Sequence, residues 1–329
     1  MTHFGTASLN EAGLRSPGQH RLDPQIVKHA HNHKDALKAA RGWQICGIDR
    51  SVWIFVLAHG GLVALLLLSD SELSRRIAGA TTTGAGYFTW DCAYVALVIA
   101  CLALHVVLYM RLYRSDPGWV GPGDGQAAEE GTLRQNCPHC GAFPPERSKH
   151  DFKTGRCVAK FDHFCPLIAS SVGDLNHSLF WFYCVFQAFL IAWAWFVTPD
   201  AAIFCLYGTS RESVTCWLLL AAVLLLVPLF NFFGGLALLH GYLAASGRTS
   251  YEICKGAKVP YLQPYYERYR GPAHFGLDPK GLASLLRELR KGNAPPAPYS
   301  LGVAENLNVF FFEKKPFLYR RSDVSHGSV

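Results

Sequence analysis

The sequence predicts an all-α polytopic membrane protein with four transmembrane helices, and three observations support that fold class. Charged residues make up only 17% of the chain and hydrophobic residues 50%, whereas a typical soluble domain is about 25% charged. Four long intervals contain no charged side chain, and positive charge is concentrated outside them. A disordered chain would be poor in apolar residues and rich in charge, so that class is excluded.

The uncharged intervals locate the membrane spans. The first two, 51–69 and 92–110, are each 19 residues long, close to the roughly 20 residues that a helix needs to cross the hydrocarbon core. About fifty residues precede the first interval, which is therefore not the short apolar core of a cleaved signal peptide. The predicted spans are 52–69, 91–110, 178–198 and 215–243.

Basic residues set the predicted orientation. Segment 1–50 carries seven Lys and Arg, segment 114–177 seven and the tail 246–329 thirteen, whereas the two remaining loops carry three in all. Positively charged loops stay in the cytosol, so both termini and the middle loop are expected there. The net charge of +7 is therefore explained by the basic residues of the predicted cytosolic segments. We expect the lipid bilayer as a partner and no nucleic acid.

The spans divide the chain into five segments. These are a cytosolic N-terminal segment (1–50), transmembrane helices 1 and 2 (51–113), a cytosolic cysteine-rich domain (114–177), transmembrane helices 3 and 4 (178–247) and a cytosolic C-terminal region (248–329). In the last of these, leucines recur at helical spacing within 279–292. That pattern fits a helix on the membrane surface or, equally, one packed on the cysteine-rich domain.

A group of metal-binding residues lies in the middle loop. Cys137 and Cys140 form a C-x2-C knuckle, and His150 and Cys157 follow it. Three thiolates and one imidazole suit a tetrahedral zinc ion, and the reducing cytosol does not favour disulfides. His139, inside the knuckle, is a competing ligand. We expect one structural zinc, which would hold together a loop without a strong strand or helix pattern.

The same loop holds a candidate catalytic group in the order Asp162-His163-Phe164-Cys165. His163 can take the proton of the Cys165 thiol, and Asp162 can orient the imidazole, an arrangement suited to nucleophilic catalysis. Nearby basic residues favour the thiolate further; they are Lys149, Arg156 and Lys160. On spacing alone, a second and poorer metal site that uses His163 and Cys165 is equally compatible.

These motifs together resemble the DHHC family of protein S-acyltransferases (palmitoyltransferases) over roughly residues 90–310. Beyond the cysteine-rich loop, the matching residues are Asp116-Pro117-Gly118, Pro145, Arg147, Ser148, Val172, Gly173, Asn176, Thr249-Ser250-Tyr251-Glu252 and Asn306. The stretch RSKH…CVAKFDH is most similar to the ankyrin-bearing branch, although this sequence shows no ankyrin repeats.

The resemblance also exposes a systematic departure in the metal ligands. Family members usually hold two zinc ions, and the loop keeps one complete ligand set: Cys137, Cys140, His150 and Cys157. The second set is entirely replaced, by Asp151, Thr154, Phe164 and Ser171. Phe164 therefore removes a ligand and no catalytic group, and a full replacement can repack as a metal-free lobe. The resemblance implies one zinc and an active DHFC centre.

The function implied is protein S-acylation in the endomembrane system, at the Golgi apparatus or the endoplasmic reticulum. Cys165 would take palmitate from palmitoyl-CoA, with Arg147 near the coenzyme A phosphates, and pass it to cysteines of cytosolic or membrane proteins. Ser250 stands where the family has Thr and is expected to reach Asp162 with its hydroxyl. Cys254 is a candidate for self-acylation, although an unmodified thiol is the expected state.

Two other functions stay open. An inactive DHHC-like membrane scaffold or acyl-chain binder is motivated by the lost zinc set and by Leu167, which replaces a Trp that lies near the thioester in the family. A zinc-stapled transporter is the other, because intramembrane ionisable groups favour transport; the spans offer only His59, His105 and His240. The retained Asp-His-Cys set and Glu252 favour the enzyme.

Overall fold

Long apolar helices dominate the structure. The computed structural model describes residues 44–45, 48–68, 75–79, 90–121, 136–197 and 214–313. Three of the helices in these segments are long and apolar enough to cross a membrane: α4 (Trp90–Tyr113), α5 (His177–Val197) and α7 (Val214–Ser246). The chain is therefore a multi-pass membrane protein.

The first predicted span corresponds to helix α2 (Arg50–Leu68), which is 19 residues long. The part of α2 with described side chains, Arg50–Ala64, is apolar but shorter than a span requires. Three spans are thus supported by described residues, and the fourth remains a prediction. Most of the N-terminal segment 1–50 lies outside the described part of the chain.

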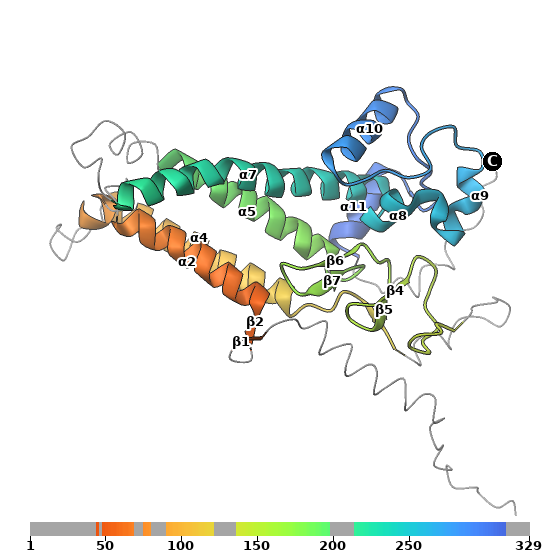
Figure 1. Cartoon of the computed structure of the whole chain (residues 1–329), viewed down its shortest axis with the longest axis horizontal. Helices are drawn as coiled ribbons and strands as arrows, with labels where there is room; N and C mark the ends of the chain where they lie inside the picture. Colours follow the sequence, from red (N-terminus) through yellow and green to blue (C-terminus); the bar gives the residue numbers. More distant parts are fainter. Residues whose placement is uncertain are drawn as a thin grey trace, which may run out of the picture.

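The four long helices form one elongated bundle (Figure 1). The two later helices pack most extensively on each other, and the Trp181 indole of α5 donates a hydrogen bond to the Ala237 carbonyl of α7 at 2.9 Å. The loop 136–176 and the C-terminal helices lie at the same end of the bundle (Figure 1). Both regions therefore meet where α4 ends, α5 begins and α7 ends.

The middle loop departs from the all-α expectation, because it contains short strands. Strand β5 (Arg156–Val158) lies between β3 (Trp119–Val120) and β4 (Lys149–Asp151), and β6 (His163–Cys165) pairs with β7 (Ser170–Val172); all pairings are antiparallel. Another short pair, β1 (Gln44–Ile45) and β2 (Ile48–Asp49), precedes α2. Strands of two or three residues are too short to leave a period-two pattern in a sequence.

Short helices follow α7 and cover its end. They are α8 (Ser250–Lys255), η1 (Gly256–Lys258), η2 (Pro260–Leu262), α9 (Gln263–Tyr266), α10 (Pro279–Arg290) and α11 (Val303–Phe311). Helix α8 begins in a capping box, since the Thr249 hydroxyl accepts from the Glu252 amide and Glu252 accepts from the Thr249 amide. The buried Asn306 side chain donates to the Ala245 carbonyl, which fastens α11 to the end of α7.

Helix α10 packs on protein. Asp278 caps its first turn by accepting a hydrogen bond from the Gly281 amide. Leu285 is buried against Leu243 of α7 and Ile253 of α8. Helix α10 thus packs on α7 and α8, a contact that neither sequence-based alternative named. Its contact with a membrane surface stays a prediction.

Two adjacent leucines of α10 provide a test of this packing. Leu285 is 3% exposed and Leu286 is 56% exposed. Leu285→Ala should lower the stability by about 2–5 kcal/mol, because it leaves a cavity in a packed cluster. The control Leu286→Ala should change it by less than about 0.5 kcal/mol. Thermal unfolding of the detergent-solubilised protein measures both, and equal shifts for the two variants would contradict the packing.

Candidate active site

The four predicted metal ligands come together in the structure. Cys137, Cys140, His150 and Cys157 place their ligand atoms within 4.8 Å of one another. The Cys137 sulfur lies 3.5 Å from His150 Nδ1, and the Cys140 and Cys157 sulfurs lie 3.5 Å apart. Zinc–sulfur bonds of about 2.3 Å in a tetrahedron separate ligands by roughly 3.8 Å, so this Cys/His cluster fits a zinc ion.

Local structure explains why these ligands meet. His150 on β4 and Cys157 on β5 are directly opposite in the antiparallel register. The knuckle turns tightly, since the Gly141 amide donates to the Cys137 carbonyl and Gly141 has a φ of +69°, a conformation that favours glycine. His139, the competing ligand, lies outside the cluster and packs its ring 5.0 Å from that of His150.

Strand β6 carries the candidate catalytic residues on the hairpin with β7. His163 and Cys165 are two positions apart, so their side chains project from the same face of the strand. Phe164 lies between them and faces the opposite way, opposite Ser171 of β7. Cys165 is 4% exposed and belongs, together with Ile168, to an apolar cluster that extends along α5 as far as Ala194.

Helix α4 anchors the turn of this hairpin. The Tyr109 hydroxyl donates to the Leu167 carbonyl at 3.2 Å. Ile168 is 1% exposed in the same cluster as Tyr109 and Leu112. The hairpin that carries Cys165 therefore packs against the helix bundle. Leu167, which takes the place of an expected Trp, has an exposed fraction of 36%.

Asp162 links several parts of the site. Its Oδ2 accepts a hydrogen bond from His163 Nδ1 at 2.7 Å, and its Oδ1 accepts one from the backbone amide of Ser250 at 2.6 Å. Its own amide donates to the Val172 carbonyl of β7. Asp162 is 1% exposed. The expected pairing of Asp162 with His163 is thus present in the structure.

Two buried histidines complete the surroundings of Asp162. His177 of α5 and His240 of α7 lie 3.9 Å and 3.8 Å from its carboxylate oxygens, and they share a hydrogen bond of 2.8 Å with each other. The three residues could be taken for a metal site. Their atoms are already engaged in short hydrogen bonds, however, so we interpret them as a hydrogen-bonded cluster.

Sequence reasoning missed this histidine pair. The sequence suggests His240 only as an intramembrane ionisable group, and it gives no role to His177, which follows the V-G-x-x-N motif. Each is a polar residue at the end of a long apolar helix that faces the loop. A search of the sequence for polar residues near helix ends would have found both histidines. It would not have predicted that they face each other.

Electrostatics favour a charged pair of Asp162 and His163. Burial raises the pKa of the Asp162 carboxyl, but the neighbouring His177 and His163 outweigh burial and hold that pKa well below its usual range. Burial lowers the pKa of His163, but its interactions with Asp162 and with the Cys165 sulfur raise it from 6.5 to about 10. His163 is therefore protonated at neutral pH beside the sulfur of Cys165.

The contact between Ser250 and Asp162 differs from the expected one. Asp162 is reached by the backbone amide of Ser250, whereas the buried Ser250 hydroxyl has no hydrogen-bond partner in the described part of the chain. The expectation that the hydroxyl makes this contact is wrong. The reason is the helix start: the capping box leaves the amide of Ser250, the first residue of α8, free to donate to the carboxylate.

Arg147 lies in a buried ion pair. Its guanidinium donates to both carboxylate oxygens of Glu252, at 2.6 Å and 2.8 Å, and to the Gly247 carbonyl at 2.9 Å. The guanidinium also stacks on the ring of Tyr299, and Arg147 is 4% exposed. These contacts join the loop to α8. The contact of Arg147 with coenzyme A phosphates remains a prediction.

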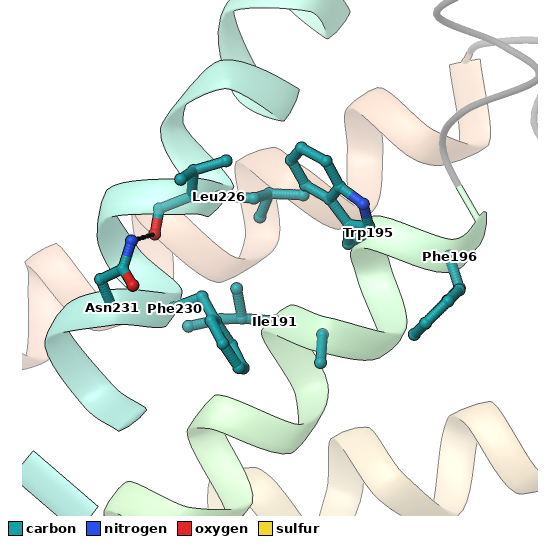
Figure 2. A pocket seen from close by; sticks show the side chains of 8 residues that line it. Ile191, Trp195, Phe196, Leu226, Phe230 and Asn231 are labelled. Carbon is teal, nitrogen blue, oxygen red and sulfur yellow. Dashed lines mark hydrogen bonds between the residues drawn. The ribbon is translucent and has the colours of Figure 1, made fainter. Parts of the chain in front are cut away.

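An apolar cavity of about 350 Å³ lies between α5 and α7. Figure 2 shows its lining, in which the carboxamide of Asn231 donates to the Val227 carbonyl of the same helix. The part of its wall on α5 begins at Ile191. This is fourteen residues beyond His177, or about 21 Å along a helix. The cavity therefore lies further along the bundle than His177, and its lining residues Ile191 and Leu226 belong to the same apolar cluster as Cys165.

The structure thus combines a Cys/His cluster with an Asp–His pair beside a cysteine, both at the end of a bundle of apolar helices. These features define a membrane protein with a cysteine-centred site. Residues 131–257 match the family described as DHHC palmitoyltransferase. The chain therefore carries, over these residues, a segment similar to the DHHC palmitoyltransferase domain.

Several named relatives are similar to the chain. Palmitoyltransferase ZDHHC12 of Homo sapiens is 28% identical over 215 residues, which are 62% of this chain and 76% of that protein. Palmitoyltransferase ZDHHC17 of Rattus norvegicus is 34% identical over 176 residues, 45% of this chain and 28% of the relative. Protein S-acyltransferase 10 of Arabidopsis thaliana is 30% identical over 130 residues, 39% of this chain and 36% of the relative.

The pKa of His163 predicts a pH dependence of stability. Because it is raised from 6.5 to about 10 on folding, the charged pair with Asp162 contributes stability that is complete below pH 6.5 and is lost as the pH rises through about 10. His163→Gln keeps a hydrogen-bond donor but does not titrate. The decline in Tm between about pH 7 and about pH 10 should be smaller in this variant; parallel curves for the two proteins would contradict the assignment.

Proposed function

We propose that this chain is a protein S-acyltransferase that moves palmitate from palmitoyl-CoA, through an acyl-enzyme on Cys165, to cysteines of substrate proteins. One observation carries the proposal: His163 and Cys165 project from the same face of β6, while Asp162 holds the His163 ring at 2.7 Å. A cysteine beside an oriented imidazole is the arrangement of an activated thiol nucleophile. The names of the relatives support the same reaction.

The first half of the reaction uses the Cys165 sulfur as the nucleophile. The protonated His163 stabilises the thiolate, which attacks the carbonyl carbon of the acyl-CoA thioester. The bond between that carbon and the coenzyme A sulfur breaks, and His163 gives its proton to the departing thiolate. Coenzyme A leaves as a thiol, and the acyl chain is held on Cys165 by a new thioester bond.

The second half reverses these roles. His163, now neutral, accepts the proton of an acceptor cysteine, whose sulfur attacks the thioester on Cys165. The Cys165 thiolate leaves and is again paired with the protonated imidazole. Asp162 keeps Nδ1 of His163 engaged in both halves, so the other ring nitrogen is left to move the proton.

The position of Cys165 suits an acyl donor. Cys165 belongs to the apolar cluster that includes Ile168 and Tyr183 and extends into the bundle. Each CH₂ group of a fatty acyl chain gains about 0.8 kcal/mol when it leaves water. A chain attached at this position would pass directly from the hairpin into the apolar interior of the bundle or the lipid around it.

A structural zinc is the implied metal. Cys137, Cys140, His150 and Cys157 would hold it, and when bound the zinc supplies a cross-link within the loop. The loop and the C-terminal helices lie at the same end of the bundle (Figure 1), which supports an orientation with both in the cytosol. We also propose four spans and a Golgi or endoplasmic reticulum location, on the charge pattern and the family resemblance.

The inactive-scaffold alternative is not favoured. A scaffold would not need the geometry of Asp162, His163 and Cys165, and Glu252 remains engaged with Arg147 beside them. Leu167 contributes its backbone carbonyl to the contact with Tyr109, so replacement of a Trp side chain leaves the anchor of the hairpin intact.

Labelling with an alkynyl palmitoyl-CoA tests the proposed function. The wild-type protein should form a hydroxylamine-sensitive thioester adduct that Cys165→Ser lacks, because serine is a far weaker nucleophile in this setting. Cys254→Ser is the control, since Cys254 is a half-buried cysteine outside the proposed mechanism. In-gel fluorescence and mass spectrometry of the labelled peptide report the site. Equal labelling of wild type and Cys165→Ser would overturn the proposal.

A further inference from the structure

A second network of buried polar side chains lies behind the catalytic hairpin. Asp151 is 4% exposed and ends strand β4. Its Oδ2 accepts hydrogen bonds from the Ser171 hydroxyl at 2.7 Å and from the Thr154 hydroxyl at 2.9 Å. Its Oδ1 accepts one from the Lys153 amide at 3.1 Å. These are the positions, with Phe164, at which the family resemblance places a second zinc.

The residues present do not fit a zinc ion. Structural zinc sites use cysteine sulfur and histidine nitrogen, whereas this lobe offers one carboxylate, two hydroxyls and a phenyl ring. Hydrogen bonds within the protein already occupy both oxygens of Asp151. A buried carboxylate with three donors is a satisfied group that needs no cation.

The network joins the metal cluster to the catalytic hairpin. Successive residues of a strand point to opposite faces, so β4 presents His150 to the Cys/His cluster and Asp151 to the other side. The bond from Ser171 to Asp151 spans 20 residues of sequence. The segment that it closes contains Asp162, His163 and Cys165.

The hairpin β6–β7 therefore has two distinct faces. His163 and Cys165 lie on the face that carries out the proposed chemistry, and Ser171, opposite Phe164 in the register, lies on the back. Ser171 has no exposed surface, and its backbone carbonyl accepts from the Asn176 side chain. Two hydrogen bonds thus fix Ser171: Asn176 binds its backbone carbonyl, and Asp151 binds its hydroxyl.

We propose that Asp151, through its hydrogen bonds to Ser171 and Thr154, takes over the cross-linking role of a second metal ion and positions the hairpin that carries Cys165. Asp151 is a positioning residue, because its carboxylate acts on the hairpin through Ser171. The lobe is metal-independent, so the folded protein holds one zinc ion. The proposal rests on the proposed function only in taking Cys165 as the nucleophile that the hairpin carries.

The first experiment measures metal content and the reactivity of individual cysteines. Purified full-length wild type should contain one zinc per chain, and Ser171→Ala and Asp151→Ala should retain it. A neutral maleimide should modify Cys165 about tenfold faster in both variants, because loss of a charge-assisted hydrogen bond loosens the hairpin. Site-resolved mass spectrometry should show Cys184, which has no exposed surface in α5, unchanged.

Lys153→Ala is the matched control. It removes an exposed side chain next to the network but keeps the backbone amide that Asp151 uses. Cys165 reactivity should equal that of wild type, whereas Asp151→Asn, which keeps an acceptor oxygen, should fall between wild type and Asp151→Ala. Two zinc ions in the wild type, or Cys165 reactivity in Ser171→Ala equal to that of Lys153→Ala, would overturn the proposal.

A gain-of-function variant tests the geometry independently. Asp151→Cys, Thr154→Cys, Phe164→His and Ser171→Cys combined should raise the zinc content from one to two per chain. A value that stays at one in the folded variant would contradict the placement of these four side chains around one point. Neither readout depends on acyl transfer. Failure of acyl-enzyme formation in the wild type would therefore count against the proposed function alone.

Discussion

The arrangement of this site depends on the contacts of a single buried carboxylate, that of Asp162. It binds His163 of the hairpin on one oxygen and the first amide of α8 on the other, and His177 and His240 bring α5 and α7 to the same point. A carboxylate without these partners would be costly to bury. The charge of Asp162 therefore stabilises the site only when four separate parts of the chain have assembled around it.

The capping box of α8 connects this carboxylate to a second one. Glu252 caps the helix and binds Arg147, while the neighbouring Ser250 amide reaches Asp162. The Arg147 carbonyl in turn accepts a hydrogen bond from the Phe161 amide, next to Asp162 in sequence. The middle loop and the C-terminal region are thus joined by two contacts, Arg147 with Glu252 and Asp162 with Ser250. These contacts explain why motifs about a hundred residues apart in the sequence lie at one site.

The sequence was sufficient to predict the apolar helices, the four-member Cys/His cluster and the pairing of Asp162 with His163, because each depends on local spacing or composition. The contacts of Ser250, Arg147 and His177 were not predictable in this way. They depend on which groups face each other after the helices pack, and a sequence does not encode that in any local pattern. The contact of Asp151 with Ser171 was likewise not predictable, since only the fold brings the two residues together.

The rate of acyl-enzyme formation in Asp162→Asn tests the central role of Asp162 most directly. Asparagine preserves the size of the side chain but removes its charge and turns one acceptor into a donor. Single-turnover reaction with palmitoyl-CoA should slow by about 10²–10⁴-fold, while the zinc content stays at that of the wild type. A rate within about a factor of two of wild type, in a folded sample, would contradict the account.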